Sequence, residues 1–205
     1  MPSLSRHFDP NSTEHWDRVY ARERSEGRLR QDTGLLTYLG LFAGRARILD
    51  FGSGPGGNVV VLGPHLPKCT FTLVDQSETA LNEARERLDG RVDHDFVFAR
   101  NLEGVPPGSQ DLILAIEVLE HLRAYRSVLH RLWEDLAPGG LLLLSVPVKG
   151  WRDRQREHVN KFTIAKMFRI LSAYTDWVHI SPRSHSRRSG ILSTAYFYIM
   201  KPPAA

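Results

Sequence analysis

A glycine-rich segment flanked by two acidic residues is the first part of this sequence whose residue types could do chemistry. Gly52, Gly54 and Gly56 follow an apolar run that ends in Asp50, and Asp75 follows the next apolar run, 19 residues after Gly56. Glycines let a backbone turn sharply and approach a ligand closely, and an acidic residue at the tip of the second strand can accept hydrogen bonds from both ribose hydroxyls. The spacing therefore predicts a nucleotide site.

Asp50 indicates which kind of nucleotide this site takes. A carboxylate directly before the glycines repels a pyrophosphate, which opposes a nicotinamide dinucleotide, but it attracts an ammonium group. S-adenosylmethionine is an adenosyl cofactor that carries such a group. We therefore expect S-adenosylmethionine rather than NAD.

A second group of reactive side chains follows the fourth apolar run. Glu117, Glu120 and His121 are spaced i, i+3 and i+4, so one helical turn would present all three on one face. Together with His158 they would suit a hard divalent cation such as Mg²⁺. The alternative is a site without metal, in which Glu117 orients the ligands, His121 or His158 is the general base, and Glu120 is a surface acid paired with Arg123.

Short apolar runs alternate with helical patterns from residue 46 onward, which predicts an α/β fold that positions these groups. The runs predict strands at 46–50, 70–74, 96–99, 112–116 and 141–146. Two later runs, 177–180 and 192–200, have no helix between them and are expected to pair antiparallel at a sheet edge.

The segments between these strands predict helices. We expect them at 57–66, shortened by Pro64, at 78–88 with Ser77 as the cap, and at 125–136. Residues 137–140 (APGG) predict a turn. Thr163 can cap a last helix, whose inward side chains are expected to be Ile164, Met167, Phe168 and Leu171.

The composition excludes several classes of protein. The chain has 205 residues, 41% of them hydrophobic and 24% charged, which excludes a disordered or fibrous chain and predicts one domain over residues 1–205. No apolar stretch is long enough for a membrane span and the first ten residues do not resemble a secretion signal, so we expect a cytoplasmic protein. The single Cys69 excludes an intrachain disulfide and a cysteine zinc site.

Positive charge is concentrated in the last quarter of the chain. Residues 149–205 contain 11 of the 27 Lys and Arg residues but three of the 23 Asp and Glu residues. Six arginines lie in segments 149–161 and 181–190, where an α/β fold places ligand contacts: Arg152, Arg154, Arg156, Arg183, Arg187 and Arg188. They predict an anionic acceptor, and because only Trp151 and Phe162 supply aromatic rings there, a small-molecule or glycan acceptor is favoured over nucleic acid.

Four motifs together resemble the class I S-adenosylmethionine-dependent methyltransferases: ILDFGSGPGG, LVDQS, QDLILAIEVLEHL and LAPGGLLLLSVP. The resemblance extends from about Trp16 to the C-terminus. It implies an α/β fold with a Rossmann-like doubly wound seven-stranded sheet, an antiparallel last strand and three α/β/α layers. It also implies an N-terminal helical lid (1–45), a cofactor-binding core (46–147) and a region of acceptor-binding and C-terminal strands (148–205).

The resemblance further implies roles for single residues. Asp50 and the backbone of the glycine turn would hold the amino-acid part of the cofactor, Asp75 the ribose and Gln76 the adenine. Asn101, next to Leu102, stands where many family members have an Asp for the adenine amino group, and its amide oxygen can still accept.

Two further roles concern the methionine end and the lid. Ile116 would contribute backbone at the methionine end of the cofactor. Trp16 and Tyr20 resemble an N-terminal helix that covers the cofactor, with simple packing on the core as the alternative.

The Glu-x-x-Glu-His pattern with a later His before a Phe resembles metal-dependent O-methyltransferases of quinone biosynthesis and of small-RNA 3′ ends. In those families the metal holds the acceptor oxygen and lowers its pKa. We therefore expect methyl transfer from S-adenosylmethionine to an oxygen of a small-molecule or saccharide acceptor, with or without Mg²⁺. An RNA-end 2′-O-methyltransferase and a non-catalytic S-adenosylmethionine-binding module are the alternatives.

Overall fold

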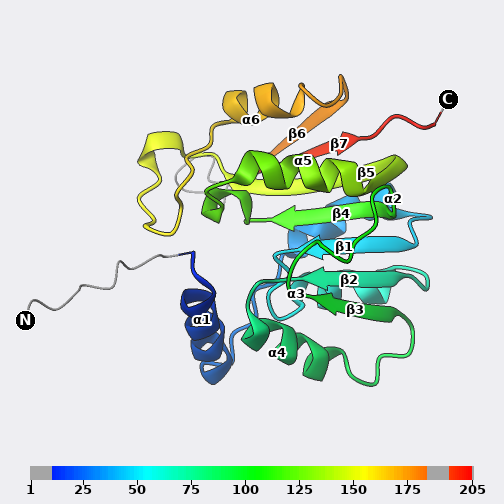
Figure 1. Ribbon diagram of the computed structural model, residues 1–205, viewed down its shortest axis with the longest axis vertical. Coiled ribbons are helices and arrows are strands. Elements are labelled where there is room, and N and C mark those ends of the chain that lie inside the picture. The colour runs from blue at the N-terminus through cyan, green and yellow to red at the C-terminus, as the bar shows by residue number, and fades with distance from the viewer. Residues whose placement is uncertain (1–10, 184–193, 205) are drawn as a thin grey trace, which may run out of the picture.

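A seven-stranded sheet runs through the computed structural model of the protein, which describes residues 11–183 and 194–204 (Figure 1). The strand order is β3-β2-β1-β4-β5-β7-β6, in which β1 to β5 are parallel and β7 is antiparallel to both of its neighbours. This confirms the Rossmann-like doubly wound sheet with an antiparallel last strand. The strands are β1 (Arg47–Phe51), β2 (Thr70–Val74), β3 (Asp95–Ala99), β4 (Gln110–Ile116), β5 (Leu136–Pro147), β6 (Val178–Arg183) and β7 (Thr194–Met200).

Helices cover both faces of the sheet. The α-helices are α1 (Thr13–Ser25), α2 (Leu39–Phe42), α3 (Gly57–Leu62), α4 (Glu78–Leu88), α5 (Tyr125–Asp135) and α6 (Ile164–Leu171). Short 3-10 helices are η1 (Thr33–Tyr38), η2 (Gly63–His65), η3 (Leu119–His121) and η4 (Gly150–Arg152). Side chains of η1, α2, α3 and α4 pack on one face and those of α5 and α6 on the other, while α1 lies beyond the carboxyl ends of the parallel strands, beside α4 (Figure 1).

Two predicted helix caps are present. The hydroxyls of Ser77 and Thr163 accept hydrogen bonds from the backbone N–H groups of Ala80 and Lys166, both at 3.1 Å. Each cap satisfies one of the N–H groups that the first turn of a helix leaves without a partner. As expected from Pro64, α3 ends early, and the chain continues as η2.

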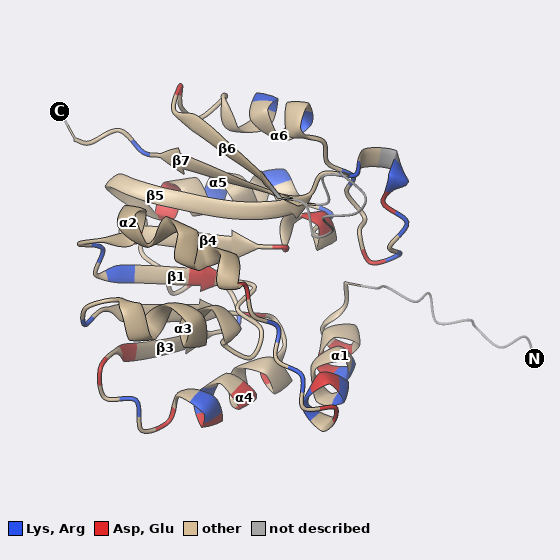
Figure 2. Ribbon diagram, turned by 180° about the vertical axis from the view of Figure 1, so that it is seen from behind, with Lys and Arg blue, Asp and Glu red and all other residues tan. Residues whose placement is uncertain are grey.

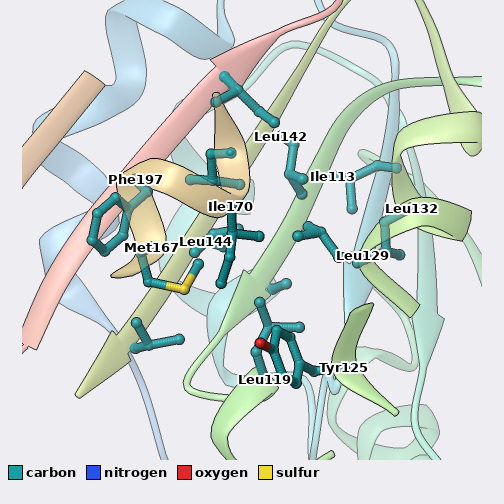
Figure 3. Close-up of a cluster of buried hydrophobic side chains, with 14 of the residues drawn as sticks. Ile113, Leu119, Tyr125, Leu129, Leu132, Leu142, Leu144, Met167, Ile170 and Phe197 are labelled. Atoms are coloured by element: carbon teal, nitrogen blue, oxygen red, sulfur yellow. The ribbon is translucent and has the colours of Figure 1, made fainter. Parts of the chain in front are cut away.

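The core under α5 and α6 is built from side chains of β4 and β5. Ile113 and Leu144 are buried against Leu129 of α5 and Met167 of α6 (Figure 3). Phe168 was expected in this core but is 47% exposed. The buried stripe of this helix is formed by Met167, Ile170 and Leu171, which places Phe168 at its edge.

The predicted turn at 137–140 is wrong. These residues belong to β5, which begins at Leu136 with an irregular register against β4. Gly139 has a φ of 75° and its N–H donates to the carbonyl of Lys201, at 3.0 Å. A β-bulge therefore absorbs the Pro-Gly-Gly sequence without ending the strand.

None of the helices in the described part of the chain combines the length and the apolar character that crossing a membrane requires.

Candidate active site

A cavity of about 730 Å³ lies at the carboxyl ends of β1, β2 and β4. Its volume is in the range of sites for small ligands. Most of the residues predicted for the cofactor line it: Trp16, Tyr20, Gly52, Gly54, Asp75, Gln76, Asn101, Leu102 and Ile116. The four predicted acceptor residues line the same cavity: Glu117, Glu120, His121 and His158. Asp50 and Gly56 are not on its wall.

The glycines of the turn have left-handed backbones that side chains rarely adopt, and at Gly52 there is also no room for a side chain. Gly52 has a φ of 72°, and a Cβ there would lie 2.5 Å from a methyl group of Val118. At Gly54, with a φ of 51°, a Cβ would lie 3.2 Å from the hydroxyl of Tyr20. Gly56 faces inward, where a Cβ would meet Ala84 at 3.4 Å, so this glycine serves packing of the turn on α4.

Asp75 is held at the edge of the cavity by hydrogen bonds from the chain. Its two oxygens accept from the backbone N–H groups of Gly54 and Ser77, both at 2.9 Å. Burial raises the pKa of Asp75, and these two hydrogen bonds, followed by the nearby Tyr20 hydroxyl, oppose the rise. The carboxyl is thereby fixed in place with remaining lone pairs for a ribose.

Asp50 lies behind the cavity wall, and Asn58 stands between it and the ligand space. The side-chain amide of Asn58 donates to both oxygens of Asp50, at 3.1 and 3.3 Å, which leaves the Asn58 amide oxygen as an acceptor on the wall. Burial raises the pKa of Asp50 to about 7, and the Asn58 hydrogen bond counteracts it. Asp50 could therefore act on a bound ligand only through its charge and through the orientation of Asn58.

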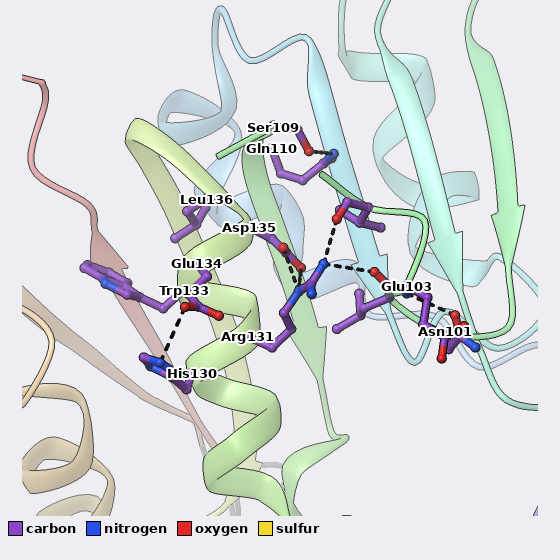
Figure 4. A network of polar contacts seen from close by, with 12 residues as sticks. Asn101, Glu103, Ser109, Gln110, His130, Arg131, Trp133, Glu134, Asp135 and Leu136 are labelled. Carbon is purple, nitrogen blue, oxygen red and sulfur yellow. Dashed lines mark hydrogen bonds and ion pairs between the residues drawn. The ribbon is translucent and has the colours of Figure 1, made fainter. Parts of the chain in front are cut away.

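The loop after β3, at the predicted adenine end, is fixed by α5. Arg131 donates to the carbonyls of Leu102 and Val105, at 3.1 and 2.6 Å, and pairs with the buried Asp135 at 2.8 Å (Figure 4). Asn101 accepts from the N–H of Glu103 at 3.0 Å, within the same loop. The position of Asn101 and Leu102 thus depends on a polar network anchored in α5.

A segment that sequence reasoning missed also lines the cavity: residues 30–32, here named the strap. Arg30 lies 5.8 Å over the ring of Trp16 and pairs with Glu23 at 2.7 Å. Asp32 accepts from the N–H of Gly34 at 2.9 Å and from the hydroxyl of Tyr196 in β7. No motif marks these residues, because their place results from contacts with chain segments far away in the sequence.

The acceptor residues do not lie on one helical turn, so that expectation is wrong. Glu117 has a φ of 54°, which reverses the chain after β4, and η3 begins two residues later. Ser145 of β5, also missed from sequence, donates to the Glu117 carboxylate at 3.0 Å and its carbonyl accepts from the Glu117 N–H at 3.1 Å. Burial raises the pKa of Glu117 to about 7 against the effect of this hydrogen bond.

Glu120 is fully buried, so its interpretation as a surface acid paired with Arg123 is wrong. No residue in the described ranges donates a hydrogen bond to either of its carboxylate oxygens. Burial first, and then the nearby charge of Glu117, raise its pKa well above the usual value. An unpartnered buried carboxyl group is costly, and a native site that retains one calls for a physical reason.

The imidazoles of His121 and His158 lie next to Glu120, and in both rings Nδ1 is hydrogen-bonded to the loop after β5. Nδ1 of His121 donates to the carbonyl of Glu157 at 3.1 Å, and Nδ1 of His158 donates to the carboxylate of Asp153 at 2.6 Å. Nε2 therefore remains the available nitrogen of each ring, and that of His121 lies 3.9 Å from Glu120. Burial lowers the pKa of His121 to about 4, so this ring is neutral at pH 7.

One ligand atom from each of Glu120, His121 and His158 lies within 4.8 Å of the other two. The three residues could therefore hold a metal ion. The structure brings them together as expected, whereas Glu117 is beside this group and bonded to Ser145.

The structure describes four of the six arginines predicted to bind the acceptor. Arg152, Arg154 and Arg156 are exposed on the positively charged loop after β5 (Figure 2). Arg183 ends β6, and Arg187 and Arg188 lie outside the described residues. Phe162 is buried in the core and offers no stacking surface.

Comparison with known proteins identifies relatives of this chain. A profile of the methyltransferase domain family matches residues 49–142. A trans-aconitate 2-methyltransferase of Methylobacterium nodulans is 36% identical over 64% of this chain and 50% of its own length. Another, of Acidovorax ebreus, is 30% identical over 93% of this chain and 68% of its own length. The chain thus spans about half to two thirds of these curated relatives.

A solved structure with the same fold is phosphoethanolamine N-methyltransferase 2 of Haemonchus contortus, in complex with phosphomonomethylethanolamine and S-adenosylhomocysteine. It superposes with a TM-score of 0.72 at 15% identity, covering 94% of this chain and 59% of that one. Taken with the glycine turn and the sheet order, these matches show that the chain belongs to the class I S-adenosylmethionine-dependent methyltransferase family.

Proposed function

We propose that this protein transfers the methyl group of S-adenosylmethionine to an oxygen of a small anionic acceptor, with a divalent cation held by Glu120, His121 and His158. One observation carries the proposal. The buried Glu120 has no donor among the described residues and faces two imidazoles whose Nε2 atoms are available, on the wall of the cavity that also contains the glycine turn.

The donor set indicates the class of cation. Two imidazole nitrogens and one carboxylate suit Mn²⁺, Fe²⁺, Co²⁺ or Zn²⁺, whereas Mg²⁺ prefers oxygen ligands. The sequence suggested Mg²⁺, but two of the three donors that lie together are nitrogens. We therefore propose a first-row transition metal in place of Mg²⁺.

When bound, such a cation would act as a Lewis acid and lower the pKa of an acceptor hydroxyl, or neutralise an acceptor carboxylate. The chain itself supplies orientation. Glu117, fixed by Ser145, faces the cavity between the proposed metal ligands and Ile116 at the methionine end. Trp16, whose ring lies 4.9 Å from that of His121, and Tyr20 cover the reacting groups from α1 and exclude water.

The charge at this end of the cavity supports a role for the cation in acceptor binding. The acidic side chains there are Asp32, Glu117, Glu120 and Glu157, and the nearby Arg30 is already paired with Glu23. Where these carboxyl groups are ionised, an anionic acceptor would be repelled without an additional positive charge. The curated relatives named trans-aconitate 2-methyltransferases suggest a carboxylate acceptor for this chain too.

Calorimetry and mass spectrometry test the proposal. S-adenosylhomocysteine is titrated into the purified protein, and then MnCl₂ into that complex, with wild type and Glu120→Gln. We expect one Mn²⁺ per chain in wild type, at least tenfold weaker binding in the variant, and unchanged S-adenosylhomocysteine binding in both. Methyl transfer to trans-aconitate, and to a catechol as an uncharged oxygen acceptor, is then measured with and without EDTA.

Each result has a defined meaning. Turnover that EDTA abolishes and Mn²⁺ restores supports the proposal, whereas turnover that survives EDTA with full rate removes the cation from it. Cofactor binding without turnover on any acceptor favours the non-catalytic module. Tight, salt-dependent RNA binding through exposed arginines 152, 154 and 156 would favour the RNA-end alternative.

A further inference from the structure

The loop after β5 contacts the Nδ1 atoms of both imidazoles. Behind His158 lies Asp153, which is 6% exposed and whose carboxylate accepts the Nδ1 hydrogen of His158 at 2.6 Å. Its other oxygen accepts from the N–H of Gln155 at 3.2 Å, and Lys161 lies 4.0 Å away. The carboxylate is therefore itself fixed by the loop that carries His158.

The same loop is tied to the turn that carries Glu120 and His121. Asn160 donates from its side chain to the carbonyls of Leu119 and Leu122, at 3.1 and 2.6 Å, and from its backbone to that of Glu120, at 3.0 Å. These bonds hold η3 against the loop, so polar contacts, together with the buried Leu119 and Phe162, set the position of His158 relative to Glu120.

We propose that Asp153 is a positioning residue that fixes the tautomer and the ring orientation of His158, an inference that rests on the proposed function only for its effect on metal affinity. A neutral imidazole has one N–H and one lone pair, and a carboxylate at Nδ1 selects the tautomer whose lone pair is on Nε2. Because Nδ1 is bonded to Asp153, Nε2 is the atom that His158 can offer toward Glu120 and His121. Partners of this kind behind a ligating histidine typically change metal affinity 10- to 100-fold.

The test compares three variants of the full chain. Asp153→Ala removes the acceptor, and Asp153→Asn retains an amide oxygen that can still accept the Nδ1 hydrogen. The matched control is Asp111→Asn, near the amino end of β4 and away from the cavity, where Asp111 accepts from the backbone N–H of Arg47 at 2.9 Å. Two properties are measured: the side-chain ¹⁵N shifts of His158 by NMR in metal-free protein, and MnCl₂ affinity by calorimetry in the S-adenosylhomocysteine complex.

We expect wild type and Asp111→Asn to show a protonated Nδ1 and an unprotonated Nε2 at His158. Asp153→Ala should give averaged or inverted shifts and bind Mn²⁺ about 10- to 100-fold more weakly. Asp153→Asn should retain the tautomer and lose less affinity, and S-adenosylhomocysteine binding should remain within twofold in all variants. If Asp153→Ala does not fold, the tautomer in wild type and the affinity of Asp153→Asn decide the question.

Two results would overturn the inference: a His158 in wild type whose Nδ1 is unprotonated, or an Asp153→Ala variant with wild-type shifts. If the shifts depend on Asp153 while wild type binds no Mn²⁺, the positioning role holds and the metal part of the proposed function fails. The two proposals can therefore fail separately.

Discussion

The two ends of the cavity bury carboxyl groups in opposite ways. At the cofactor end, Asp50 receives the amide of Asn58, and Asp75 receives two backbone N–H groups. At the acceptor end, Glu120 is equally buried, and no described residue donates to it. Buried polar groups are stable where the fold supplies their partners. The cofactor end is therefore complete within the chain, whereas the acceptor end contains a buried carboxyl group that the proposed cation would neutralise.

The largest effect is expected from Asp75→Ala, which should weaken cofactor binding without affecting the acceptor end. Each charge-assisted hydrogen bond contributes roughly 1.5–3 kcal/mol, so loss of two ribose bonds should weaken S-adenosylhomocysteine binding about 100-fold or more. Calorimetric titration measures this, while Mn²⁺ binding to the same variant should be retained. A dissociation constant within threefold of wild type would show that Asp75 does not hold the ribose.

At the acceptor end, replacing the buried carboxyl group is expected to stabilise the metal-free protein. Glu120→Met replaces a buried carboxyl without a donor by an apolar side chain of similar length, and should raise the free energy of unfolding of metal-free protein by about 1–3 kcal/mol. The pKa of Glu120 is higher in the folded than in the unfolded protein. The carboxyl group therefore destabilises the fold increasingly as the pH rises above the pKa that Glu120 has in the unfolded chain. The gain should therefore be larger at pH 7 than at pH 4.5.

Urea denaturation at both pH values, with and without Mn²⁺, checks this. Wild type should gain stability from Mn²⁺, and Glu120→Met should not. A Glu120→Met variant less stable than metal-free wild type at pH 7 would mean that the Glu120 carboxyl group has a stabilising hydrogen-bond partner in the folded protein.

A smaller effect concerns the pH dependence of cofactor binding. The pKa of Asp50 is raised to about 7, so below that pH the carboxyl is increasingly neutral and attracts the ammonium group of S-adenosylhomocysteine less. Affinity should fall by up to about tenfold per pH unit below 7 and level off above it. Asp50→Asn should bind weakly with no such slope, and a slope that persists in this variant would assign the titration to another group.

The smallest effect is expected from Tyr20→Phe, which removes the hydroxyl that favours the ionised form of Asp75 and keeps the ring beside Trp16. The free energy of unfolding should fall by about 1 kcal/mol. Mn²⁺ affinity should not change, because the hydroxyl belongs to the cofactor end. Thermal denaturation of the two proteins in parallel measures the difference, and an unchanged midpoint would show that the hydroxyl has an equally good alternative partner.

Local patterns in the sequence predict most of the fold. The apolar run before the glycines, the Ser77 and Thr163 caps and the early end of α3 each depend on residues within a few positions of one another. The errors are also local. Phe168 lies just outside a buried stripe, and the Pro-Gly-Gly sequence forms a bulge where it was expected to end a structural element.

The candidate site is less predictable because its supporting residues come from distant segments. Asn58, Ser145, Asp153 and the strap act through contacts that exist only in the folded chain. The i, i+3, i+4 spacing correctly groups Glu120 and His121 but assumes a regular helix. The left-handed backbone of Glu117 turns the chain before η3, and this is what buries Glu120.

The contact between Gly52 and Val118 has a consequence for how acceptor specificity could diverge in evolution. A single methyl group added at position 52 would lie 2.5 Å from Val118, which precedes η3 in the turn that carries Glu120 and His121. The glycine turn and the acceptor turn therefore cannot drift independently. A side chain at position 52 would require Val118, or the backbone of one of the two turns, to move, so a change in one turn constrains the other.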